Sequence, residues 1–402
     1  MAFSEDFIAE GHLIDSGSFQ RMLDAVVRTG GEFEVLHFHV GTTNESTSRL
    51  QLRVMAESEE LLSEIRAELH ELGAERAGLG DVRLETCETD GVAPLEFYST
   101  TNHPTEVSIN GRWRPVGAQR MDAAIIVDGD EAQCRKLRDL RRGDAVVCGT
   151  AGVRIHPPAR RRERDDFAFM SGEVSSERRV HTAVSQLAGE LERLKASGGK
   201  IVWVAGPVVV HTGGSDGLVR LIESGFVSSL LAGNALAVHD VERALFGTSL
   251  GVQVETGLPM PEGHRHHMKA INRVRHSGSL SAAVRDGWLT SGVMHACVTR
   301  EVPYVLAGSL RDDGPLPDVI TDIVEAQDAY ASELAGAELV ILLGSMLHGI
   351  AVGNMLPSTV HTICVDINPA VVTKLVDRGS SQTHGLVTDV GLFLHLLADR
   401  CC

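Results

Sequence analysis

The C-terminal half of the chain alternates nearly uninterrupted apolar segments with helical patterns. Lys200–Val210 has the sequence KIVWVAGPVVV, and such continuous apolar runs are typical of strands buried on both faces of a parallel sheet. Because strands and helices alternate here, the pattern predicts an α/β fold with a doubly wound parallel sheet. Further expected strands are Phe226–Ala232, Leu236–Val238, Val302–Ala307, Leu339–Leu343 and Val360–Val365, and expected helices include Asp216–Ser224 and Val319–Leu334.

The N-terminal part of the chain shows a different pattern. Glu32–Val40 and Ser48–Ala56 alternate apolar and polar positions, as half-buried strands do. Phe19–Thr29 and Ser58–Leu72 carry apolar residues at helical spacing. The order helix, strand, strand, helix, followed by a strand-like Val82–Thr86, is close to that of a ferredoxin-like α+β domain.

A third region lies between these two parts. Short apolar runs at Ala123–Val127 and Ala145–Cys148 are broken by glycines, which is typical of an irregular β-rich region. A chain of 402 residues is also longer than one hydrophobic core usually serves. We therefore expect an α+β ferredoxin-like domain over residues 1–115, a β-rich middle region with a connector helix over 116–190, and a Rossmann-like domain over 191–402.

Composition and charge mainly exclude function classes. The formal net charge of −17 disfavours binding to nucleic acid. Met1–Glu10 lacks the apolar core of a signal peptide, and no apolar run reaches the roughly 18 residues of a membrane span. The seven cysteines show no CxxC or zinc spacing, and the adjacent histidines of Gly263–His267 do not share a helix face. We expect a cytoplasmic protein that binds neither membrane nor metal.

Two glycine-bearing loops follow expected strands, where ligands of an open parallel sheet bind. His211–Ser215 contains Gly213-Gly214 and fits either ligand approach or a tight turn. Gly344-Ser345 precedes an expected helix start, as phosphate binding at a helix N-terminus requires. Asp366 ends the next strand about 20 residues later, where an acid hydrogen-bonds the ribose of NAD and disfavours the 2′-phosphate of NADP. A helix N-cap is the alternative role for Asp366.

Three polar clusters are further candidates for a substrate site. Gly233-Asn234 lies between two apolar runs and is followed by His239-Asp240. The charged loop Arg311–Asp318 follows an expected strand and suits either a polar substrate or plain solvent exposure. Phe97–Thr105 is rich in polar side chains, and such loops carry function more often than cores do. A structural turn is the alternative for that segment.

Several of these segments resemble the archaeal-type ornithine cyclodeaminases, a family also described by its lysine-oxoglutarate reductase/saccharopine dehydrogenase (LOR/SDH) conserved region. The resemblance extends from about residue 10 to about residue 395. It is carried by Glu10–Ser16, Phe97–Thr105, Ser171–Glu177, Ala307–Asp322, Met346–Pro357 and Val365–Pro369.

The resemblance implies a C-terminal NAD domain like that of deoxyhypusine synthase and conversion of L-ornithine to L-proline and ammonia. NAD would take a hydride from the α-carbon, the δ-amine would attack the resulting imine, ammonia would leave and the hydride would return, so NAD would be recycled. The residues that would line the dinucleotide are Asn234, Ala235, Asp313, Gly344, Ser345, Met346, Leu347, His348, Asp366, Asn368, Asp389 and Val390.

This reaction needs a base near the α-amine, a cation for the α-carboxylate and exclusion of water. By chemical type, Arg154 and Arg311 are candidates for the carboxylate fork. The candidates for the base or for the partner of the δ-ammonium are Glu173, Asp240 and Asp312, and Asn102 and His103 are candidates to complete the pocket.

Two other functions remain open at this point. An NAD-dependent amino-acid dehydrogenase of the saccharopine type would use the same sheet and cofactor, and so would a noncatalytic amino-acid sensor. In each case the partner is a small amino acid, and we expect a homo-oligomer, either a dimer or a tetramer.

Overall fold

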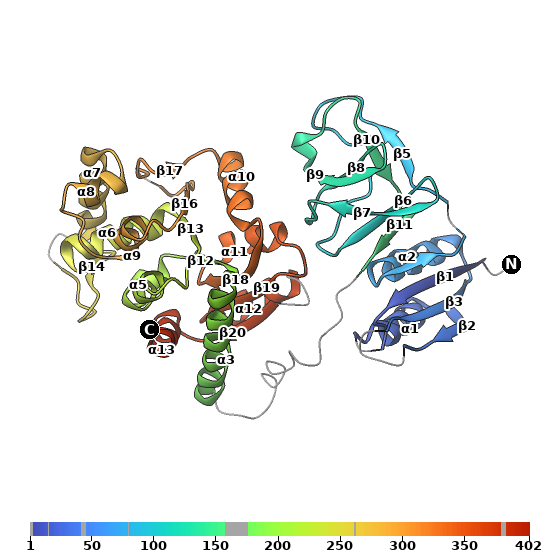
Figure 1. Ribbon diagram of the computed structural model, residues 1–402, viewed down its shortest axis with the longest axis horizontal. Helices are drawn as coiled ribbons and strands as arrows, with labels where there is room; N and C mark the ends of the chain where they lie inside the picture. The colour runs from blue at the N-terminus through green and yellow to red at the C-terminus, as the bar shows by residue number, and fades with distance from the viewer. Residues whose placement is uncertain are drawn as a thin grey trace. The chain divides into compact units, whose positions relative to one another are not determined.

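The computed structural model describes residues 3–14, 16–41, 46–78, 80–156, 176–260, 263–312, 314–378 and 383–402. Contacts divide the chain into two compact units (Figure 1). Unit 1 comprises Met1–Ala168 and Leu356–Thr359, and unit 2 comprises Phe169–Met355 and Val360–Cys402. Within the described ranges, no helix combines the length and the apolar character needed to cross a bilayer.

The first part of unit 1 has the expected ferredoxin-like fold. Its sheet has the order β2-β3-β1-β4, and the inward side chains of β1 and β3, such as Phe7 and Leu52, pack on α2. Helix α2 begins where Ser58 accepts a hydrogen bond from Leu61 N, an N-cap that satisfies a donor of the first turn. The elements are β1 (Phe3–Gly11), α1 (Ser18–Thr29), β2 (Glu32–His39), β3 (Ser48–Ala56), α2 (Glu59–Glu71) and β4 (Ala74–Arg76).

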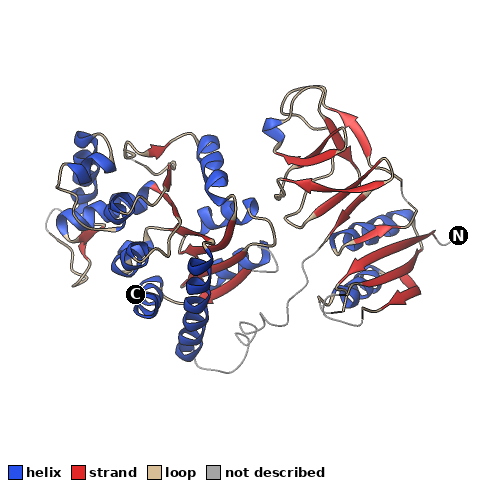
Figure 2. Cartoon of the chain, in the orientation of Figure 1, coloured by secondary structure: helices blue, strands red, loops and turns tan. Residues whose placement is uncertain are grey.

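The rest of unit 1 is a seven-stranded, mostly antiparallel sheet, which confirms the expected β-rich region (Figure 2). Its order is β11-β6-β7-β9-β8-β10-β5. Val82–Thr86 was expected to follow the ferredoxin-like elements as their next strand, but Arg83–Thr86 instead pairs with Ala145–Cys148 in this second sheet. The strands are β5 (Arg83–Thr86), β6 (Thr105–Ile109), β7 (Arg112–Gly117), β8 (Ala124–Asp128), β9 (Glu131–Arg135), β10 (Ala145–Cys148) and β11 (Val153–Ile155).

Unit 2 contains the expected doubly wound parallel sheet, with the order β17-β16-β13-β12-β18-β19-β20. All six pairings between neighbours are parallel, and helices lie on either side of the sheet (Figure 2). The chain winds outward from β12 in one direction and then restarts at β18 in the other. The strand order therefore reverses between β12 and β18, which is the topological switch point where such folds bind ligands.

The strands of this sheet are β12 (Lys200–Ala205), β13 (Ser229–Gly233), β16 (Tyr304–Ala307), β17 (Val319–Ile320), β18 (Ala337–Leu343), β19 (His361–Asp366) and β20 (Thr383–Val387). A small hairpin, β14 (Thr248–Ser249) and β15 (Val252–Gln253), lies outside it. The α-helices of unit 2 are α3 (Ser176–Ser197), α4 (Val208–His211), α5 (Ser215–Glu223), α6 (Asn234–Phe246), α7 (His266–Ser277), α8 (Leu280–Arg285), α9 (Val293–Thr299), α10 (Ile323–Leu334), α11 (Met346–Met355), α12 (Pro369–Arg378) and α13 (Val390–Cys401).

Three expectations about single elements were wrong. The strand expected over Lys200–Val210 ends at Ala205, because Pro207 has no N–H to continue a central strand and a short helix follows. Leu236–Val238 lies inside α6, since a short apolar run does not distinguish a strand from a buried helix. The first two residues of Val319–Leu334 form the edge strand β17 rather than a helix.

Candidate functional site

The switch point brings two glycines into close contact. Gly206 follows β12 and donates its N–H to Leu343 O of β18 at 2.8 Å. A Cβ at Gly206 would overlap the carbonyl of Gly344, and a Cβ at Gly344 would overlap the side chain of Val208. Gly344 also has a φ of 53°, in the left-handed region. Only glycine fits at both positions, so the two backbones approach closely where a parallel sheet of this kind has its ligand-binding crevice.

Helix α11 begins immediately beyond this crossing. Its first turn carries no acidic residue, and the side chains of Met346 and Leu347 are exposed. Ser345 Oγ lies 2.8 Å from His348 Nδ1, which ties the turn to the helix. The free N–H groups and the helix dipole of such an N-terminus favour an anion. Gly344, Ser345, Met346, Leu347 and His348 therefore form one continuous edge of the crevice.

The next two strands end beside it. Asp366, at the end of β19, accepts Asn368 N at 2.8 Å, and Asn368 Oδ1 accepts Ala370 N in the first turn of α12. The helix cap is thus Asn368, and one carboxylate oxygen of Asp366 has no partner in the described part of the chain. Asp389 caps α13 by accepting Leu392 N. The side chain of Val390 lies beside Gly344, 3.4 Å from where a Cβ would stand there.

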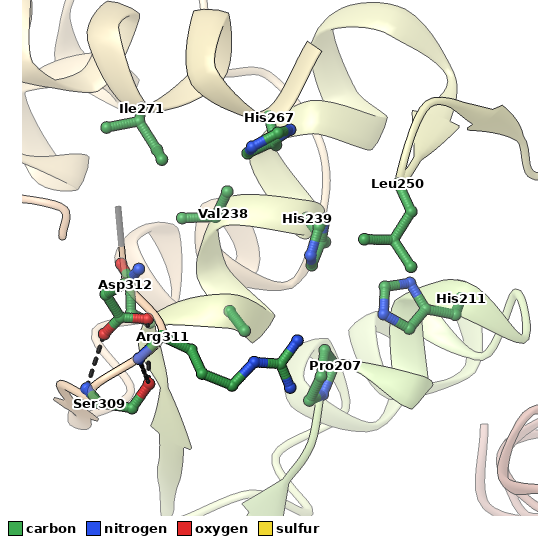
Figure 3. A pocket seen from close by; sticks show the side chains of 12 residues that line it. Pro207, His211, Val238, His239, Leu250, His267, Ile271, Ser309, Arg311 and Asp312 are labelled. Carbon is green, nitrogen blue, oxygen red and sulfur yellow. Dashed lines mark hydrogen bonds between the residues drawn. The ribbon is translucent and has the colours of Figure 1, made fainter. Parts of the chain in front are cut away.

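A cavity of about 330 Å³ opens within unit 2 at the carboxyl ends of β12, β13 and β16. Its lining includes Asn234 and Ala235 from the start of α6 and Arg311 and Asp312 from the loop after β16 (Figure 3). Asn234 Oδ1 accepts Leu316 N at 3.1 Å and so holds that loop. The structure therefore brings four of the predicted site residues together.

Arg311 and Asp312 differ in how they are held. Both oxygens of Asp312 face Ser309, with Oδ2 accepting Ser309 N at 2.7 Å. Figure 3 shows the Arg311 side chain extending towards Pro207. Among the residues that the structure describes, the Arg311 guanidinium has no hydrogen-bond or ion-pair partner. An exposed, unpaired guanidinium at a cavity suits an incoming carboxylate.

The cavity is also lined by His211, His239 and His267, which lie in segments noted from the sequence but were not among the predicted site residues. The rings of His211 and His239 lie 4.8 Å apart in an edge-to-face arrangement. Burial, chiefly, and the neighbouring His239 lower the pKa of His211 to about 4, so His211 is neutral near pH 7. Across the described residues, no group of histidines, cysteines or acids has the arrangement of a metal site.

His239 contacts a buried carboxylate. Its Nδ1 lies 2.9 Å from Glu242 Oε2, and the Glu242 side chain is fully buried. Glu242 also accepts Thr248 Oγ1 and Gly251 N, each at 2.9 Å. Burial alone would raise the pKa of Glu242, but the hydrogen bonds from His239, Gly251 and Thr248 outweigh it and lower that pKa. His239 and Glu242 are three residues apart, a spacing that brings two side chains together only in a helix. The sequence therefore indicates this pair only if the segment is assigned to a helix.

Asp240 does not line the cavity. Its side chain is fully buried and accepts Val293 N and Met294 N, both at 2.8 Å, in the first turn of α9. Burial raises the pKa of Asp240 to about 6 against the lowering effect of these two bonds. A Cβ at Gly292 would stand 2.6 Å from this carboxylate. The position supports a structural role that joins α6 to α9, and not the expected role as a base.

The other candidates lie in unit 1 or outside the described residues. Arg154 is paired with Glu106 at 2.9 Å and stacks over Trp113 at 4.1 Å, so its charge is already partly engaged. Asn102 is buried and His103 is partly buried, and burial lowers the pKa of His103. Glu173 and Asp313 lie outside the residues that the structure describes.

Three family models match consecutive parts of the chain. The model "Arginine dihydrolase ArgZ-like, C-terminal, Rossmann fold" matches residues 185–397, and the corresponding first region matches residues 104–184. The "LOR/SDH bifunctional enzyme conserved region" matches residues 4–103. The chain belongs to the ArgZ-like family. The resemblance noted in the sequence is thereby confirmed.

Relatives that match almost the whole of this chain include two kinds of protein. The bifunctional arginine dihydrolase/ornithine cyclodeaminase AgrE of Nostoc sp. is 52% identical over 404 residues, which are 97% of this chain and 57% of that protein. The ornithine cyclodeaminase of Methanopyrus kandleri is 51% identical over 387 residues, 96% of this chain and 94% of that protein. The chain thus spans little more than half of the bifunctional ArgZ-like relatives.

Solved structures of ArgZ-like proteins agree with this assignment. The apo structure of cyanobacterial ArgZ, an arginine dihydrolase, matches with a TM-score of 0.85 at 47% identity, over 100% of this chain and 58% of that one. The ternary complex of AgrE with ornithine and NAD⁺ matches with a TM-score of 0.55 at 49% identity, over 100% of this chain and 57% of that one.

Proposed function

We propose that this chain is an ornithine cyclodeaminase that converts L-ornithine to L-proline and ammonia with NAD as a bound cofactor. Archaeal relatives that it matches over nearly their whole length carry that name, at 51% identity for Methanopyrus kandleri and 47% for Methanocaldococcus jannaschii. The observation that carries the proposal is the unpaired Arg311 guanidinium in a cavity beside the switch-point crevice.

The residues of the crevice fit NAD. The crossing of Gly206 and Gly344 leaves no Cβ in the way of a pyrophosphate, and the N-terminus of α11 offers N–H groups to it. The unpartnered oxygen of Asp366 suits the ribose hydroxyls of the adenosine. Asn368, Asp389 and Val390 complete the edge formed by β19 and β20. When bound, NAD supplies an acceptor for a hydride from the substrate α-carbon and returns that hydride later.

The cavity fits the substrate by size and charge. A volume of about 330 Å³ is at the lower end of the range for small-molecule pockets and suits an amino acid. We assign Arg311 to the α-carboxylate, because its guanidinium is free to form a forked pair. We assign Asp312 to the δ-ammonium, because its carboxylate is held beside Arg311 by Ser309.

Turnover of ornithine tests the proposal directly. We expect purified protein with NAD to form equal amounts of proline and ammonia without accumulating NADH, since the reaction has no net oxidation. Stoichiometric NADH would instead favour the saccharopine-type dehydrogenase. Tight NAD binding with no conversion of ornithine would favour the noncatalytic sensor.

A further inference from the structure

We infer that His239 is the acid–base catalyst of the cavity and that Glu242 is its positioning residue. This inference rests on the proposed function, because it assigns the proton transfers of that reaction. The candidates for the base that were considered from the sequence are all carboxylates, whereas this inference assigns the proton transfers to an imidazole.

The placement of His239 follows from the geometry of α6. Asn234, Ala235, Val238 and His239 all line the cavity, and residues four apart, such as Asn234 with Val238 and Ala235 with His239, share one face of a helix. Figure 3 shows the ends of Arg311 and the rings of His239 and His211 around the same space. An amino acid whose carboxylate is held by Arg311 therefore presents its α-nitrogen within the part of the cavity that His239 lines.

Glu242 determines which nitrogen of His239 carries hydrogen. The pKa of Glu242 is lowered by its hydrogen bonds, so the group is a carboxylate near pH 7 and can only accept. His239 Nδ1 therefore donates to Glu242 Oε2, which leaves Nε2 as the acceptor. A buried carboxylate that orients an imidazole in this way also stabilises the imidazolium formed when Nε2 takes a proton.

Glu242 itself is held rigidly from several directions. Thr248 Oγ1 donates to Oε1, and Thr248 in turn faces His266 Nδ1 at 2.8 Å. The N–H groups of Gly251 and Leu250 donate to the two carboxylate oxygens at 2.9 and 3.2 Å. These bonds come from the turn that includes β14, so the hairpin beside α6 has the specific task of holding Glu242 in place. A surface ion pair would not need such a set of donors.

His211 is the neighbouring imidazole, and it differs in one respect. Its Nδ1 contacts the hydroxyl of Ser249 at 2.6 Å rather than a carboxylate. A neutral hydroxyl gives a protonated ring no charge stabilisation, and the pKa of His211 is lowered to about 4 by its burial and by His239. His211 therefore remains neutral beside His239 and shapes the cavity without taking the proton.

The proton transfers balance as follows. The α-ammonium of bound ornithine loses one N–H proton to His239 Nε2, which gives a neutral α-amine and an imidazolium. The freed electron pair on nitrogen is what the oxidation of the α-carbon requires. The δ-ammonium loses one proton to water and adds to that carbon as the free amine, which leaves the new ring nitrogen positively charged. His239 gives its proton to the original α-nitrogen, which leaves as ammonia, and takes one proton from the ring nitrogen. It passes that proton to the proline nitrogen at the end of the cycle, so the imidazole ends in its starting state.

The first test replaces the imidazole. We expect His239→Gln to lower kcat by about 10²- to 10⁴-fold, the usual share of general acid–base catalysis. KM for ornithine and the NAD affinity measured by calorimetry should change by no more than a few-fold, because glutamine leaves Arg311 and the glycine crevice intact. The matched control is His276→Gln on the exposed face of α7, which should behave like the wild-type enzyme.

The second test separates catalysis from structure. His239→Gly should regain activity when imidazole is added to the solution, whereas a residue with only a packing role gains nothing from imidazole. Glu242→Gln should lower kcat about 10- to 100-fold, and the double variant with His239→Gln should be no slower than His239→Gln alone, since the two side chains act as one unit. If Glu242→Gln does not fold, the imidazole rescue still decides the role of His239.

The outcomes also distinguish this inference from the proposed function. If the wild-type chain does not convert ornithine, the proposed function fails. If the wild-type chain converts ornithine and His239→Gln does so at the same rate, the function stands and the assignment of His239 is overturned. Full loss of His239→Gly activity without any imidazole rescue would likewise overturn it, provided that NAD binding and folding are preserved.

Discussion

Arg311 projects into the cavity of unit 2 without a partner among the described residues, whereas Arg154 is already paired with Glu106 and stacked on Trp113. Both were expected candidates for the same task because both are arginines near polar segments. Residue type alone cannot separate them, because availability for a ligand depends on which neighbours have already engaged the charge. The ion pairs and stacking contacts that an arginine already makes therefore determine whether it is available to bind a substrate carboxylate.

Arg311→Ala should raise KM for ornithine about 10- to 100-fold, because a hydrogen bond to a charged group contributes about 1.5–3 kcal/mol. Arg311→Lys should recover only part of this loss, since lysine keeps the charge but not the fork. Steady-state kinetics with ornithine measure both. Arg300→Ala, a change at an exposed arginine after α9, is the control. An unchanged KM in Arg311→Ala would place the carboxylate elsewhere.

Asp366→Ala should weaken NAD binding by about tenfold, because the hydrogen bonds to the ribose hydroxyls are lost. The same change should reduce the discrimination against NADP, since the carboxylate no longer repels a 2′-phosphate. Calorimetric titration with each dinucleotide measures this. The exposed Asp128→Ala in unit 1 serves as the control. Equal NAD affinity in Asp366→Ala and the wild type would show that the ribose lies at another strand end.

Among the elements of unit 2, helix α6 both lines the cavity and anchors helix α9. Its cavity face carries Asn234 and His239, whereas Asp240 faces α9 and holds the N-terminus of that helix. Neighbouring residues on a helix point about 100° apart, so adjacent His239 and Asp240 serve different purposes. If the predicted strand Leu236–Val238 had continued through His239 and Asp240, these two side chains would lie on opposite faces of a sheet and contact different residues.

The junction of α6 and α9 predicts a pH dependence of stability. The pKa of Asp240 in the folded protein is raised to about 6, above its usual value of 3.8. The folded state therefore binds this proton more tightly, and the stabilisation from that proton is present below about pH 4 and lost as the pH rises through about 6. Urea unfolding of the wild type and Asp240→Asn, compared at pH 4.5 and pH 7, should show the wild type losing stability relative to the variant as pH rises. If the free energy of unfolding changes equally with pH in the wild type and in Asp240→Asn, the raised pKa of Asp240 is contradicted.

The crossing of β12 and β18 predicts a strict requirement for glycine. Gly344→Ala should lower the free energy of unfolding by more than 1 kcal/mol, because its φ is positive and a Cβ would overlap Val208. Gly353→Ala is the matched control in α11, where no atom lies within 4 Å of the added Cβ. There alanine should stabilise by about 0.5–1 kcal/mol. Denaturant unfolding of both variants measures the contrast, and equal effects would argue against the close crossing.

At the scale of the whole molecule, the chain combines a ferredoxin-like fold, a β-rich sheet and a Rossmann-like unit. The sheet of unit 2 supplies the cavity and the switch point proposed to hold the cofactor, and both lie at its carboxyl edge. The expected homo-oligomer and the location of the protein stay predictions, and light scattering of the purified protein measures the former.

The proposed reaction has no net redox change, so the cofactor should not be consumed. Protein loaded with NAD and then freed of excess NAD by gel filtration should form many molecules of proline for each NAD retained. Quantifying proline, ammonia and bound dinucleotide in the same sample checks this. Product formation that stops at one equivalent of bound NAD would contradict the cyclic use of the cofactor.

The sequence by itself determined the class of fold, and it predicted the strand ends at which the proposed cofactor site lies. Continuous apolar runs that alternate with helical patterns from Lys200 onward are typical of a parallel sheet covered on both faces, and Gly344 follows one of its strands while Asp366 ends the next. Strands β1 and β4 of unit 1 were not predicted. β4 has only three residues. β1 has the sequence FSEDFIAEG, and its many polar residues do not distinguish such a short strand from a loop.

Only the tertiary structure decided which side chains meet in the cavity. The short run Leu236–Val238 suits a strand or a helix, so the direction of His239, Asp240 and Glu242 was undetermined until packing made this segment part of α6. The bonds from Thr248, Leu250 and Gly251 to Glu242 join a helix to a separate hairpin. Such contacts depend on how elements pack, since local spacing along a chain carries no information about a partner from another element.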